Sequence, residues 1–143
     1  MNTQKFIVSG IVGGIVMFVA GYVVYGLVLM NYLNTHPGLA DPKIVHRQMS
    51  EFVWWALILG HIFYGLTLSY IYNKWANIST AAAGAMAGAI LGLLFVLSYD
   101  LPMYGTTMLL SKYSFAADVL GNVIVSTITG AAVGWANSWG SKA

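Results

Sequence analysis

The sequence predicts an all-α integral membrane protein, in which four membrane-spanning helices form one bundle within a single domain over residues 1–143. Hydrophobic residues make up 59% of the chain and charged residues only 7%, with a mean hydropathy of +0.75. A soluble domain has about 25% charged residues. The net charge of +2 gives no reason to expect a nucleic-acid partner, and the absence of cysteine excludes disulfides and thiolate metal sites.

The first predicted span covers residues 6–30, a stretch without any charged side chain. It is longer than the roughly 20 residues that a spanning helix needs. Gly10 and Gly14 form a G-x-x-x-G motif on one helical face, and Gly21 follows on the same face. Such small residues let a neighbouring helix approach closely, so we expect helix packing at Gly10 and Gly14.

The loop after the first span contains a helix-start signal. Asp41 is suited to the N-cap position and Pro42 to the first helical position. We therefore expect a helix that begins at Pro42 and continues into the second span, residues 52–73. Aromatic residues bound this span at both ends, as is usual where a helix enters and leaves the bilayer: Trp54, Trp55, Tyr72 and Trp75.

His61 lies near the middle of the second span, where an ionisable group is costly. It is a candidate for proton relay, ligand contact or cofactor binding. The structural interpretation, a neutral imidazole bonded to a nearby helix, is favoured. Haem held by two histidines would need a second membrane-embedded histidine, such as one from a homodimer. His36 and His46 are loop residues without a clustered third ligand, so we expect no metal and no cofactor.

The third predicted span covers residues 80–100 and is rich in glycine and alanine, so its surface has few large side chains. Gly84, Gly88 and Gly92 repeat every four residues, the pattern of a glycine zipper. We expect this helix to be central and to pack against the first or the fourth span. Pro102 lacks a backbone donor and disfavours a helical Leu101, so the helix should end near Asp100. Residues 101–114 would then form a loop or half-helix that dips back against the bundle.

The fourth predicted span covers residues 115–138 and carries a polar stripe. At about 100° per residue, four polar side chains stay on one face: Asp118, Asn122, Ser126 and Thr129. Four spans place both termini on one side of the membrane, which we expect to be the cytoplasmic side. Asp100 and Asp118 then approach the same, outer face.

Asp100 and Asp118 are the main candidates for function. Asp118 lies near a helix start, where the helix dipole favours a carboxylate, whereas Asp100 lies at a predicted helix end, where negative charge is disfavoured. Two carboxylates that face each other in a poorly hydrated site cannot both stay ionised easily, unless Lys112 neutralises one of them. Six residues form the predicted pocket set: Asp100, Asp118, Asn122, Tyr99, Tyr104 and His61.

The Ser98-Tyr99-Asp100-Leu101 exit of the third helix and Asp118 carry a family resemblance. Together with the four-span layout, they resemble a family of small bacterial membrane proteins described as domains of unknown function. The resemblance covers most of the hydrophobic spans, and its specific part is confined to about residues 98–126. It implies a bacterial inner-membrane protein and brings no activity with it.

The expected function is therefore a non-enzymatic binding or accessory protein with an outward-facing polar pocket for a small molecule or lipid headgroup. No G-x-S-x-G, H-E-x-x-H or cysteine nucleophile indicates an enzyme. A small proton-coupled transporter is an alternative, although the small four-helix multidrug exporters carry an acid in their first span and residues 6–30 contain none. A structural subunit of a membrane complex and a homo-oligomer remain open as well.

Overall fold

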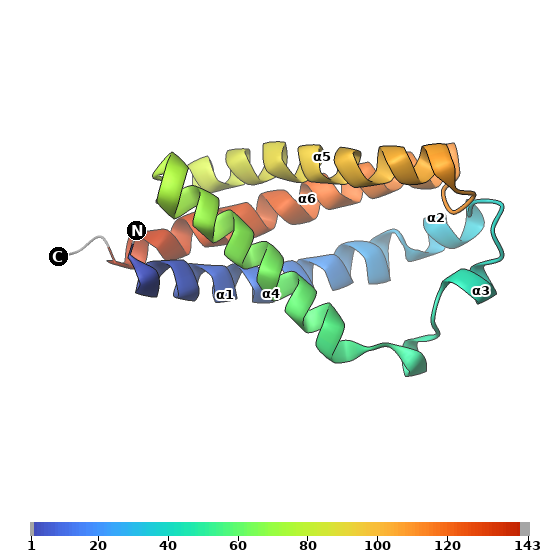
Figure 1. Cartoon of the computed structure of the whole chain (residues 1–143), viewed down its shortest axis with the longest axis horizontal. Helices are drawn as coiled ribbons and strands as arrows, with labels where there is room; N and C mark the ends of the chain where they lie inside the picture. Colours follow the sequence, from blue (N-terminus) through green and yellow to red (C-terminus); the bar gives the residue numbers. More distant parts are fainter. Residues whose placement is uncertain (1, 141–143) are drawn as a thin grey trace.

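The protein is a bundle of long helices, shown by a computed structural model that describes residues 2–140 (Figure 1). No strand occurs in this range. Four helical stretches are long and apolar enough to cross a membrane: Thr3–Val28, Trp54–Ala76, Ala81–Thr106 and Lys112–Trp139. The predicted all-α, four-span membrane fold is therefore confirmed. The first stretch begins and the last stretch ends at the same end of the bundle.

The first span changes its helical form near the far end. α1 (Thr3–Gly21) is followed by the π-helical turn η1 (Tyr22–Val28), and α2 (Met30–Thr35) continues beyond Leu29. A π-helical turn takes in extra residues and so shifts the direction in which the following side chains point. Tyr25 in η1 lies against Gly121 of the fourth span, where an added Cβ would come within 3.1 Å of the tyrosine hydroxyl.

The polar loop does not lead into the second span as one helix. α3 (Pro42–Val45) begins at Pro42 as predicted but has only four residues. A separate turn, η2 (Met49–Glu51), follows with its own capping box between Gln48 and Glu51, and Phe52 is extended with φ −62° and ψ 133°. The predicted continuous helix is therefore wrong, because the Gln48 cap starts a new turn and the extended Phe52 ends it.

The second span, α4 (Trp54–Ile71) with the π-helical turn η3 (Tyr72–Ala76), crosses α1 obliquely. The two helices meet through glycines, because a Cβ on Gly65 would overlap the backbone of Gly10 and Gly14. Ser9 and Ser69 share a buried hydrogen bond of 2.7 Å beside this contact. Residues 54–60 are all exposed, since α4 diverges from the other helices toward its beginning (Figure 1).

The third and fourth spans, α5 (Ala81–Thr106) and α6 (Lys112–Ala136), pack along each other. Their backbones come close enough that a Cβ on Gly84 would overlap the Gly130 carbonyl oxygen, and one on Gly88 the Ser126 carbonyl oxygen. A Cβ on Gly92 would likewise overlap the Ser126 side chain. The glycine face of α5 therefore lies against the fourth span.

The central helix is α6, so the prediction that the third span is central is wrong. α6 packs against α5, α1 and α4, and 44% of its apolar window is buried, compared with 22% for α5. α5 buries its glycine face against α6, whereas Met86, Ile90 and Leu94 on another face are exposed. α6 carries small or short side chains on several faces and can be approached from more than one side.

The end of α5 also differs from the prediction. The helix continues through Pro102 to Thr106, and only residues 107–111 connect it to α6. Prolines are tolerated in membrane helices where nearby groups and neighbouring helices compensate for the missing bond. Here Tyr104 packs on Phe115 of α6 with ring centroids 5.6 Å apart, so the residues beyond Pro102 are held against the neighbouring helix. Neither a helix end at Asp100 nor a half-helix over 101–114 is present.

We expect Gly88→Ala to lower the free energy of unfolding by about 1–3 kcal/mol, because the new methyl group would push the backbones of α5 and α6 apart. Gly60→Ala is the matched control, because nothing lies within 4 Å of a Cβ there. It should leave stability unchanged or raise it by up to about 1 kcal/mol through helix propensity. Thermal unfolding of both variants in one detergent measures the difference, and equal stability would contradict the close α5–α6 contact.

Candidate functional site

Asp100 and Asp118 meet between α5 and α6, at the end of the bundle opposite the start of α1. The side chain of Asp100 is buried, with 1% of its surface exposed, and Asp118 is half-buried one and a half turns into α6. The two carboxyl groups lie within hydrogen-bonding reach of each other. No group of residues 2–140 donates a hydrogen bond to Oδ2 of Asp100. The sequence-predicted acid pair is therefore brought together.

Lys112 is turned onto an aromatic ring and not onto the acid pair. The Lys112 ammonium lies over the Tyr113 ring, 5.0 Å from its centroid, and does not contact either carboxyl group. The alternative in which Lys112 neutralises one of the acids is therefore not realised.

Tyr25 joins the site from the first span. Its hydroxyl donates a hydrogen bond of 3.0 Å to the main-chain carbonyl of Asp118. Sequence reasoning did not select Tyr25. The available signal was a hydroxyl-bearing residue at the far end of the first span, at the same membrane depth as Asp118, but the π-helical turn that directs it toward α6 is not visible in the sequence.

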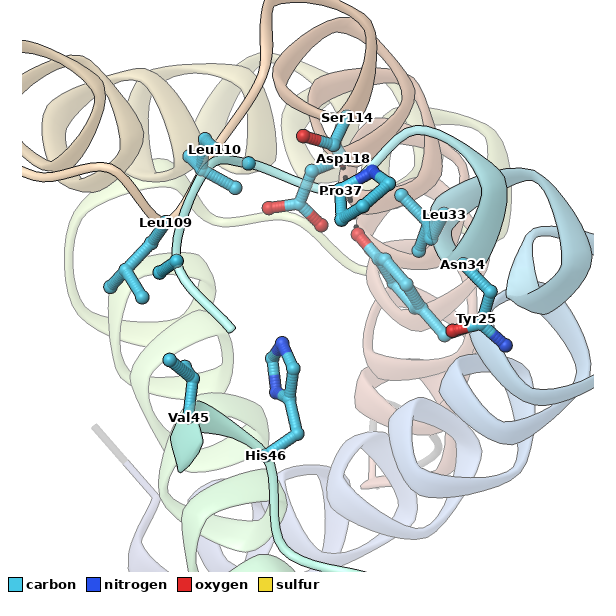
Figure 2. A pocket seen from close by; sticks show the side chains of 12 residues that line it. Tyr25, Leu33, Asn34, Pro37, Val45, His46, Leu109, Leu110, Ser114 and Asp118 are labelled. Carbon is cyan, nitrogen blue, oxygen red and sulfur yellow. Dashed lines mark hydrogen bonds between the residues drawn. The ribbon is translucent and has the colours of Figure 1, made fainter. Parts of the chain in front are cut away.

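A cavity of about 470 Å³ opens beside this cluster (Figure 2). The side chain of Asp118 points into it. Much of the remaining wall is apolar, and it comes from η1, α2, the loop after α2, the end of α3 with the residue after it, the residues before α6 and α6 itself. The lining residues are Tyr25, Leu33, Asn34, Pro37, Gly38, Ala40, Val45, His46, Leu109, Leu110, Ser114 and Asp118.

Two loops that are far apart in sequence close over this end of the cavity. The Ala40 amide donates to the Met108 carbonyl at 3.0 Å, and the Ser111 hydroxyl donates to the His36 carbonyl at 2.7 Å. Gly38 leaves no room for a side chain, because a Cβ there would overlap the backbone of Met108 and Leu109. We call residues 36–40 and 107–111 the loop lid.

Of the six residues in the predicted pocket set, Asp118 lines the cavity and the other five, including Asp100, do not. Tyr99 is 68% exposed on the outer face of α5. Tyr104 packs on Phe115, as described above. Asn122 lies one turn beyond Asp118, where its side-chain oxygen accepts a 3.2 Å hydrogen bond from Ser126. This serine is in turn 2.9 Å from the Tyr64 hydroxyl, so Asn122 belongs to a bridge between α6 and α4.

His61 is separate from the acid pair. Its Nδ1 donates a 2.6 Å hydrogen bond to the Leu57 carbonyl of its own helix, and its ring meets Phe18 of α1 edge-on at 5.4 Å. The imidazole therefore has a bonded partner, although on its own helix and not on a neighbouring one. Within residues 2–140, no group of three or more His, Cys, Asp or Glu side chains comes together that could hold a metal ion.

Comparisons of the chain with protein-family models, with curated proteins and with solved structures find no match. The resemblance carried by Ser98-Tyr99-Asp100-Leu101 therefore stays an expectation, and the functional argument rests on the geometry of the acid pair and the cavity.

We expect Gly38→Val to separate the two halves of the loop lid. Its side chain would displace Met108 and Leu109, so the bond from the Ala40 amide should open more often and this amide should exchange hydrogen about tenfold faster. Gly105→Val is the control, because a Cβ at Gly105 meets nothing within 4 Å. Hydrogen exchange followed by mass spectrometry compares the two, and unchanged exchange in Gly38→Val would contradict the packed lid.

Proposed function

We propose that the protein is a non-enzymatic binding or accessory protein of the membrane, whose cavity takes up a small molecule or a lipid headgroup. The observation that carries the proposal is the carboxyl group of Asp118 pointing into a cavity of about 470 Å³ under the loop lid. Ligand pockets typically have volumes of about 300–1,000 Å³, largely apolar walls and a few polar groups that orient the ligand.

The lining residues define the kind of ligand that fits. Leu33, Val45, Leu109 and Leu110 offer apolar contact, whereas Asp118 offers a hydrogen-bond acceptor. A ligand with an apolar body and a donor group satisfies both, because a buried acceptor without a donor costs about 1–3 kcal/mol.

The proposed orientation places this cavity at the outer face of a bacterial inner membrane, with both termini in the cytoplasm. It is supported by the arrangement of the bundle, in which α1 begins at the end opposite the cavity (Figure 1). The specific membrane is taken from the family resemblance alone.

Binding is favoured over transport because the bundle is packed beyond the cavity. Leu68, Tyr72 and Val133 are fully buried against one another. Along α6, Val133 stands between Asp118 and Asn137, which bonds to Asn73 at 2.9 Å near the other membrane face. A proton-coupled transporter would need a second conformation that opens this core. A role as a structural subunit of a complex would instead use an outer surface such as the exposed beginning of α4.

We expect Ala40→Trp to abolish retention of a co-purified molecule, because the indole would fill the cavity that Ala40 lines. Leu39→Trp is the matched control: the neighbouring Leu39 is 88% exposed and does not line the cavity. Native mass spectrometry of the gently purified wild type and both variants measures the retained mass. A bound molecule that persists in Ala40→Trp, or a wild type that never carries one in any membrane extract, would contradict the proposed binding function.

A further inference from the structure

We propose that Asp100 and Asp118 hold one proton between them and release it when an organic ammonium group enters the cavity. The site would then work as a proton–cation exchange site, specific for a basic or quaternary ammonium group attached to an apolar body. This inference rests on the proposed binding function and specifies its ligand.

The proton follows from the contact between the two carboxyl groups. Asp100 is 1% exposed, lies within hydrogen-bonding reach of Asp118, and has an Oδ2 that receives no donor from residues 2–140. Two ionised carboxylates in such a place repel each other with little water to screen them. A proton held on one carboxyl group supplies a hydrogen bond between the pair and leaves a single negative charge.

The cavity determines where a cation can reach the pair. Asp118 lines the cavity, whereas the buried Asp100 does not. An ammonium group in the cavity therefore meets Asp118 first. Tyr25 also lines the cavity, and an aromatic face attracts a cation by about 0.5–2 kcal/mol in a desolvated place. The apolar lining residues Leu33, Val45, Leu109 and Leu110 suit the hydrocarbon part of the ligand.

The exchange balances in atoms and charge. Before binding, the pair carries one proton and one negative charge. An arriving cation raises the benefit of ionising the second carboxyl group, so the proton leaves to water in the cavity and the cation takes over its charge. The site carries one net negative charge in both states, and no covalent bond forms. A neutral ligand displaces no proton, and an anion is repelled by the pair.

Among the described residues, two titratable groups besides Asp118 line the cavity. From η1, the Tyr25 hydroxyl donates to Asp118; from the loop after α3, His46 lines the same cavity. On α6 itself, Lys112 is turned onto Tyr113. His46 would oppose a cation when it carries a proton, so His46→Gln is needed as a control in any pH series.

The test uses the full-length protein and benzyltrimethylammonium as a permanent cation, with neopentylbenzene as its neutral analogue of the same shape. Isothermal titration in buffers of different ionisation heat counts the protons released. We expect about one proton released per cation bound and an affinity that rises about tenfold per pH unit over the titration range of the pair. The neutral analogue should release none. His46→Gln should keep the proton release.

Two variants separate the roles of the acids. Asp100→Asn should still bind the cation through Asp118 but release no proton and lose the pH dependence. Asp118→Asn should lose at least tenfold in cation affinity. If Asp100→Asn fails to fold, the proton count on the wild type still decides the question, since it needs no variant.

Lipid composition identifies the natural source of the ammonium group. In nanodiscs containing phosphatidylethanolamine, whose headgroup carries an ammonium, the probe should bind more weakly than in phosphatidylglycerol nanodiscs if the headgroup occupies the site. Equal affinity in both would assign the site to a free ammonium compound.

Three results would overturn the inference. Cation binding without proton release would show that the pair is already fully ionised. Equal affinity for the cation and its neutral analogue would be consistent with a binding pocket but would contradict the proton–cation exchange. Absence of binding by either probe, together with absence of a co-purified molecule, would overturn the proposed binding function as well.

Discussion

The close contact between α5 and α6 is the constraint on which the rest of the structure depends. Small residues on both helices let their backbones touch, and an added Cβ on Gly84 or Gly88 would overlap the carbonyl oxygens of α6. Without a hydrophobic driving force between helices in lipid, such backbone contact is a main source of association. The same contact sets the register in which Asp100 meets Asp118. Helix packing and the acid pair therefore have one structural cause.

The acid pair is an expensive feature to place in a membrane bundle. An aspartate at mid-membrane costs about 2.5–3.5 kcal/mol on insertion scales, and the cost falls toward the interface. The pair lies toward one end of the bundle, where Tyr25 bonds to the Asp118 backbone and the loop lid covers the cavity beside it. A merely structural role would be served by apolar residues of similar volume. A role of the pair in recognising a ligand would explain why the protein keeps two aspartates despite their free-energy cost in the membrane.

The sequence predicted the four membrane spans and the membrane face at which the acids lie. It did not predict which neighbour each helix face packs against. Hydropathy located all four spans, and counting crossings placed Asp100 and Asp118 at one membrane face. Periodicity could not tell that α6, and not α5, has neighbours on several sides, because that depends on the faces left by the other helices. Local rules predicted that the helix ends before Pro102. In the structure the helix continues, because Tyr104 packs on Phe115 of the neighbouring helix. Tyr25 reaches the site through a π-helical turn, which the sequence pattern does not reveal. The loop lid depends on contacts between segments about 70 residues apart, which local patterns cannot predict.

The most direct test of the central claim is whether positions 100 and 118 face each other in the membrane. The chain contains no cysteine, so a double variant Asp100→Cys/Asp118→Cys can be cross-linked in membranes with a short methanethiosulfonate reagent and counted by intact mass. The structure predicts efficient intramolecular cross-linking in this variant. Tyr99→Cys/Asp118→Cys is the matched comparison and should not cross-link, because Tyr99 is 68% exposed on the outer face of α5. Equal cross-linking of the two variants, or cross-linking only through position 99, would contradict the account.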